Sequence, residues 1–73
     1  MSMELRQLTS FFNLESKKNA IVCARLHNDG IIHDFIVCKN YNIDDAGKLT
    51  WTYGDYNLTL AEALQIARNW IKA

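Results

Sequence analysis

Cysteine and histidine are the residue types in this chain best suited to metal or redox chemistry, and the chain has two of each: Cys23, Cys38, His27 and His33. A structural zinc site uses four such ligands, usually in close pairs such as C-x2-C. Here the spacings are wrong, and in the strand pairing described below His33 projects to the opposite face from both cysteines. Two cysteines placed diagonally on neighbouring strands are near the distance limit for a disulfide. We therefore interpret both as buried apolar side chains and expect no metal, no cofactor and no redox role.

Acid–base and nucleophilic chemistry also lack a recognisable arrangement. Asp34 faces Arg25 in the expected hairpin and Glu62 belongs to a helix cap, while the remaining candidates lie in turns: Asp44, Asp45 and Asp55. No Ser, Thr or Cys has a nearby His with an orienting carboxylate. The three glycines lie in turns and do not form a phosphate-binding loop. We predict that the protein is not an enzyme.

Aromatic side chains are the stronger functional signal. Trp and Tyr combine a large apolar area with a polar tip and are enriched at protein interfaces. The three tyrosines cluster around the expected loops at one end of the sheet, and we predict that they bind a partner together with Trp51 of the third strand: Tyr41, Trp51, Tyr53 and Tyr56. A structural interpretation stays open, in which Trp51 and Trp70 pack the third strand against the helix.

The residues from Leu58 to Ala73 predict an amphipathic helix that must be positioned against a sheet. Thr59 and Glu62 have the spacing of a capping box, in which each side chain satisfies a backbone N–H group of the first turn. The apolar residues that follow recur at helical spacing: Leu60, Ala63, Leu64, Ala67, Trp70 and Ile71. This stripe has to be buried against other parts of the chain.

Two runs rich in β-branched residues, Ala20–His27 and Ile31–Lys39, predict a β-hairpin. Asp29-Gly30 is a typical two-residue type I′ loop. This loop places Arg25 opposite Asp34, and the opposite charges support the register. A three-residue loop would instead place Ala24 opposite Asp34.

Both faces of this hairpin are apolar over much of their length. One helix covers one face of a sheet, so the other face needs the N-terminal segment or a second protein molecule to cover it. We interpret the residues of this second face as a dimer face: Ile21, Cys23, Ile36 and Cys38.

The remaining segments complete the expected architecture. Lys48–Tyr53 alternates as a third antiparallel strand that ends at Gly54-Asp55. Residues 3–14 fit either a short helix or a strand, and we favour the helix. The predicted fold is therefore an α+β domain, a three-stranded antiparallel β-meander packed by a C-terminal amphipathic helix, with an N-terminal short helix or an extra strand.

Residues 51–70, WTYGDYNLTLAEALQIARNW, contain the pattern W-x-Y-G-x-Y followed by a Leu-x-x-Ala helix. This run resembles a strand–turn–helix signature in small accessory modules of bacterial conjugative and phage-type elements. The resemblance implies a mobile-element setting and brings no catalytic residues.

Length and charge limit the function classes. The 73 residues predict a single domain, residues 1–73, and 49% of them are hydrophobic, more than so small a core hides. The chain lacks a secretory signal and any apolar run long enough to span a membrane, so we expect a reduced, cytoplasmic setting. The formal net charge is zero, which argues against nucleic-acid binding.

These observations together predict a non-enzymatic protein–protein interaction module. It would bind or occlude a partner protein, and a homodimer is one form that it could take. The alternative is a small single-stranded nucleic-acid-binding protein that stacks bases on Trp51 and Tyr53.

Overall fold

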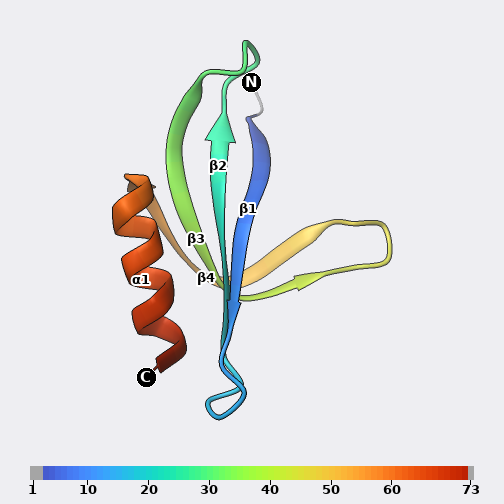
Figure 1. Ribbon diagram of the computed structural model, residues 1–73. Helices are drawn as coiled ribbons and strands as arrows, with labels where there is room; N and C mark the ends of the chain where they lie inside the picture. The colour runs from blue at the N-terminus through green and yellow to red at the C-terminus, as the bar shows by residue number, and fades with distance from the viewer. Residues whose placement is uncertain (1–2, 73) are drawn as a thin grey trace.

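The computed structural model describes residues 3–72 of the chain (Figure 1). Four strands form one antiparallel sheet in the order β1-β2-β3-β4, and a helix follows the last strand. The elements are β1 (Glu4–Phe12), β2 (Asn19–Leu26), β3 (Ile32–Ile43), β4 (Leu49–Leu58) and α1 (Leu60–Lys72). α1 packs on one face of the sheet, which we call the helix face, and the opposite face is called the open face.

The N-terminal segment is a strand, so the predicted three-stranded meander with an N-terminal helix is wrong. β1 pairs with β2 from Glu4, opposite Leu26, to Phe12, opposite Asn19, with a register shift between Gln7 and Thr9. The extra strand that the sequence left open as an alternative is the structure that forms. Pairing with β2 decides the conformation here, because strand formation depends more on neighbouring strands than on intrinsic preference.

The register predicted for the β2–β3 hairpin is confirmed over most of its length. Arg25 pairs with Asp34, and Ile21 pairs with Cys38. Side chains from this central pair of strands therefore fill both faces of the sheet, as the apolar pattern indicated.

The loop of this hairpin differs from the prediction. The His27 N–H group donates to the Ile31 carbonyl at 2.8 Å, and the Gly30 N–H group donates to the His27 carbonyl at 2.9 Å, so three residues form the loop. Gly30 has a φ of 87°, the left-handed conformation that closes this kind of loop. A register shift beside Leu26 absorbs the additional residue, which is why Arg25 still faces Asp34.

β4 is longer than the predicted strand Lys48–Tyr53, because it continues through Gly54 and Asp55 to Leu58. Gly54 does not end the strand but pairs with Cys38 of β3. The distal ends of β3 and β4 project away from α1 as a hairpin (Figure 1), which we call the hairpin arm, residues 41–51.

The helix and its cap are confirmed, with the helix beginning at Leu60, two residues later than predicted; Ala73 of the predicted range lies outside the described residues. The Thr59 N–H group donates to Glu62 Oε1 at 2.9 Å, and the Glu62 N–H group donates to Thr59 Oγ1 at 3.2 Å. Ala63 and Ala67 are fully buried against the sheet, and their small side chains allow the helix to approach closely. The helix-face core has five buried members: Ala20, Val22, Val37, Ala63 and Ala67. Within residues 3–72, no helix is long and apolar enough to cross a bilayer.

Candidate functional site

The open face has its own buried cluster, separate from the core beneath α1. Its buried members are Ile21, Cys23, Ile36 and Cys38. Three half-buried side chains from the hairpin arm pack against it: Tyr41, Leu49 and Trp51. All four residues predicted to form a dimer face are thus buried within one chain. A partner on this face would contact the side chains that pack over them, such as Tyr41, Leu49 and Trp51.

A buried ion pair lies at the turn end of the open face. Asp34 is only 7% exposed, and it accepts hydrogen bonds from Arg25 Nε at 2.6 Å and Arg25 Nη2 at 2.5 Å. The Asn57 N–H group donates to the same carboxylate at 2.7 Å, which joins β4 to the pair. The hydrogen bonds from Arg25 hold the pKa of Asp34 below its usual value, against the opposing effect of burial. The pair that supported the register is therefore also a link between three strands.

Trp51 and Tyr56 meet across Gly54, and both contribute to the open face. The Trp51 Nε1–H group donates to the Tyr56 hydroxyl at 3.0 Å. The Arg25 guanidinium lies over the Tyr56 ring, with its carbon 5.3 Å from the ring centroid. The structure thus brings two of the predicted partner-binding aromatics together, and Tyr41 packs in the same cluster. The Arg25 side chain therefore contacts both Asp34 and the Tyr56 ring.

Gly54 is required for the approach of these two rings. A Cβ atom at this position would lie 2.9 Å from Trp51 Nε1 and would collide with the Tyr56 hydroxyl. We expect Gly54→Ala to push the exposed Tyr56 ring away, break the hydrogen bond and lower the free energy of unfolding by about 1 kcal/mol. Chemical denaturation measures this loss, and a shift of the Trp fluorescence spectrum reports the changed surroundings of Trp51.

Tyr56→Phe is the control for this prediction, because it removes the same hydrogen bond without adding an atom beneath the rings. A Gly54→Ala protein with unchanged stability and fluorescence would contradict the proposed close approach.

Tyr53, the fourth predicted aromatic, belongs to a different part of the molecule. Its ring meets the Trp70 ring edge-on with the centroids 6.0 Å apart, and Trp70 packs on the helix-face core. Trp51 and Tyr53 therefore lie in separate clusters and do not form one stacking platform.

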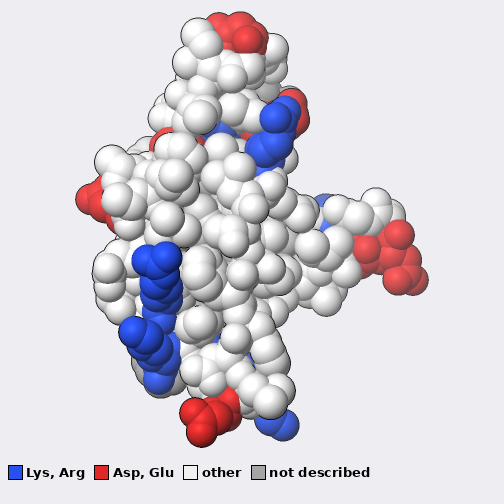
Figure 2. All heavy atoms as spheres, in the orientation of Figure 1, with Lys and Arg blue, Asp and Glu red and all other residues white. Residues whose placement is uncertain are grey.

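Lysine side chains converge on Trp70. Lys18 Nζ lies 4.5 Å and Lys39 Nζ lies 5.2 Å from the Trp70 ring centroid. Lys39 also forms an ion pair with Asp55 at 2.8 Å, which offsets its charge. In Figure 2 some basic side chains form a short stripe at the lower left and others lie apart near the upper right and at the bottom, while acidic ones lie at several of the molecule's tips. This view shows no continuous basic groove of the kind that tracks a nucleic-acid backbone.

Sequence reasoning missed the exposed surface of β1. β1 is an edge strand, paired with β2 alone. Leu8 is 46% and Phe12 is 60% exposed, and Leu5 is also exposed beside them. Leu5 lies opposite Arg25 and Phe12 lies opposite Asn19, so both share the open face with the Ile21 cluster. Part of the apolar excess expected from composition therefore lies on this strand, and the rest is spread over the loops, the hairpin tips, β4 and the start of α1.

The two cysteines are free and buried in the middle of the open face. A hydrogen bond to Cys23, together with burial, raises the pKa of the Cys38 thiol. The protonated, buried Cys38 thiol is therefore a poor nucleophile and a poor metal ligand, whereas the same hydrogen bond lowers the pKa of Cys23. Among residues 3–72, no group of three or more Cys, His, Asp or Glu side chains is arranged to hold a metal ion.

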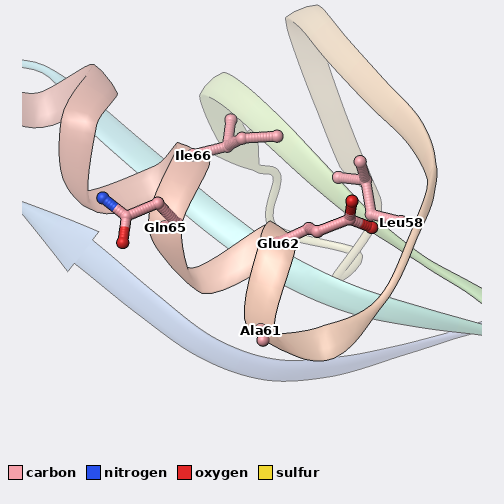
Figure 3. Close-up of a pocket in the computed structure, with 5 residues that line it drawn as sticks. All are labelled: Leu58, Ala61, Glu62, Gln65 and Ile66. Carbon is pink, nitrogen blue, oxygen red and sulfur yellow. The ribbon is translucent and has the colours of Figure 1, made fainter.

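A shallow hollow of about 360 Å³ lies beside the first turns of α1 (Figure 3). Leu58, Ala61 and Ile66 supply its apolar lining, and Glu62 and Gln65 lie at its margin. The Glu62 carboxylate is occupied by the helix cap, so the hollow offers no free charged group for chemistry.

Comparison of the chain with protein-family models, curated proteins and solved structures finds no match. The resemblance of residues 51–70 to accessory modules of mobile elements therefore stays a prediction.

Proposed function

We propose that the protein is a protein–protein interaction module that binds its partner along β1 and the adjoining open face. The observation that carries this proposal is the free edge of β1, which is exposed over almost its whole length and bears the exposed apolar side chains Leu5, Leu8 and Phe12. An extended segment of a partner could add a strand to this edge through main-chain hydrogen bonds, and the exposed side chains would select it.

Beyond the register shift at Leu8, β1 lacks the features that normally protect an edge strand. Natural sheets cover their edges or place charges, proline or bulges there. In β1 the charged residues Glu4 and Arg6 pair with each other at 3.1 Å near the start of the strand, and a register shift lies between Gln7 and Thr9. The residues from Leu8 to Phe12 carry no charge and no proline. An exposed strand of this kind associates with other chains unless a partner covers it.

The aromatic residues of the open face extend the proposed surface. Asn19, which pairs with Phe12, also accepts the Tyr41 N–H group at 2.9 Å and donates to the Tyr41 carbonyl at 3.1 Å. Phe12 is thereby connected across the sheet to Tyr41 and to its paired neighbour Trp51. A partner strand on β1 would lie at one border of this aromatic surface.

A second copy of the chain is the partner that can be tested first. We expect sedimentation of the purified protein at high micromolar concentration to show self-association. Leu8→Lys combined with Phe12→Lys should abolish it, because two charges would be buried in the strand pairing.

Ile31→Lys combined with Ile43→Lys is the matched control, since both isoleucines are exposed at other tips of the molecule. A wild-type chain that stays monomeric, and whose capture of proteins from its host is the same in the Leu8/Phe12 double variant, would contradict the proposal.

A further inference from the structure

We propose that His27 and His33 form a two-histidine site for a divalent transition-metal ion at the tip of the β2–β3 hairpin. His33 Nδ1 and His27 Nε2 lie 3.2 Å apart, and the rings meet edge-to-face with their centroids 5.0 Å apart. Both side chains are exposed. The site is independent of the β1 surface and of the interaction proposed for it.

The separation of the two nitrogens matches that of two ligands on one metal ion. With metal–nitrogen distances of about 2.0–2.1 Å, two donors at a tetrahedral angle lie about 3.3 Å apart, and two donors at a right angle lie about 2.9 Å apart. The observed 3.2 Å falls between these values. Small rotations of two exposed rings would direct both lone pairs at a common ion.

The chemistry of the pair defines the ion. Imidazole nitrogen is a ligand for Zn²⁺, Ni²⁺ and Cu²⁺, whereas Mg²⁺ and Ca²⁺ prefer oxygen. Without metal, one of the facing nitrogens donates to the other. On binding, each neutral ring would keep its proton on its other nitrogen, and water would complete the coordination of an exposed ion.

The local backbone holds the two rings together. His27 forms both hydrogen bonds that close the loop, to Ile31 and to Gly30, and His33 lies in β3 where the register shift beside Leu26 occurs. The predicted two-residue loop gave each histidine a different cross-strand neighbour. The observed three-residue loop and the register shift change the pairing of both. That change is why sequence reasoning did not bring the pair together.

Titration of the full chain with NiCl₂ in a calorimeter tests the site. We expect saturable binding to the wild type, and a loss of affinity of at least about tenfold in His33→Ala and in His27→Ala, since each removes one of two donors. Asn28→Ala, in the same loop, is the matched control and should bind as the wild type does. Equal binding by wild type and either histidine variant, or no saturable binding by the wild type, would overturn the proposal.

Proton NMR of the wild-type chain with ZnCl₂ provides a second measurement, which needs no substituted protein. The chain has only two histidines, so their ring resonances can be followed without overlap from others. Both rings should shift together and saturate at the same zinc concentration. Shifts of only one ring, or of neither, would rule out a shared ion.

Discussion

Asp34→Ala is expected to lower the free energy of unfolding by about 3 kcal/mol, because it leaves the Arg25 guanidinium without its partner. We place the loss at the lower end for a buried ion pair, since the Arg25 side chain is still 26% exposed whereas that of Asp34 is 6% exposed. The substitution also removes the acceptor for the Asn57 N–H group, which precedes the helix. Urea denaturation at neutral pH measures the loss.

The same pair predicts a pH dependence with a definite sign. Because the folded protein lowers the pKa of Asp34, the unfolded chain takes up its proton first as the pH falls. The contribution of Asp34 to stability is therefore fully present above the ordinary aspartate pKa of about 4 and is lost as the pH falls through the lower folded value. Wild type and Asp34→Ala should differ most at neutral pH and converge in acid. A difference that is constant with pH would show that the ion pair is not its source.

Arg25→Ala removes the cationic partner of the ion pair and leaves Asp34 in place. It leaves Asp34 buried with one hydrogen bond from the Asn57 N–H group, so the pKa of Asp34 should rise. It also removes the cation over the Tyr56 ring, so a change in the surroundings of Tyr56 should appear in this variant.

Ile36→Ala should cost about 2–5 kcal/mol, the range for a truncated core side chain that leaves a cavity. Ile36 is 1% exposed and is among the largest fully buried side chains of the described residues. It packs in the open-face cluster, on the side of the sheet that α1 does not cover. Thermal or urea denaturation, at a protein concentration low enough to avoid self-association, measures the effect.

Ile31→Ala is the matched control, since it removes the same atoms from a residue that is 62% exposed. Its loss should be within about 0.5 kcal/mol. Similar small losses for both variants would mean that the cluster around Ile36 is not packed within one chain.

The parts of the fold with strong local signals could be predicted from sequence. The capping box of Thr59 and Glu62 marks the start of α1, and the opposite charges of Arg25 and Asp34 set the register of β2 and β3. In both cases the deciding interaction lies between residues that are close in the chain or paired across one turn.

β1 was misread for a physical reason. The shift in its pairing between Gln7 and Thr9 adds one residue to the strand and breaks the alternation expected of a strand. Leu5, Leu8 and Phe12 consequently recur at intervals of three and four residues, which is typical of a helix. An edge strand that is exposed on most of its length also lacks a clear apolar face.

The aromatic site was predicted only in part. Tyr53 and Tyr56 are separated because β4 continues through Gly54, which the sequence indicated as the end of a strand. The two tyrosines then reach different clusters, one beside Trp70 and one beside Trp51. The path of a strand past a glycine depends on its pairing with β3, which no local pattern reveals.

The junction between β4 and α1 limits how the chain can vary in length. Only Thr59 separates Leu58 of the strand from Leu60 of the helix. Each residue of an α-helix turns by about 100° around its axis, so one inserted residue would rotate Ala63 and Ala67 out of their contact with the sheet. A one-residue connection is too short to accommodate an insertion without moving the helix. Any descendant of this chain that keeps the same fold has to keep the same count of residues between its last strand and its helix.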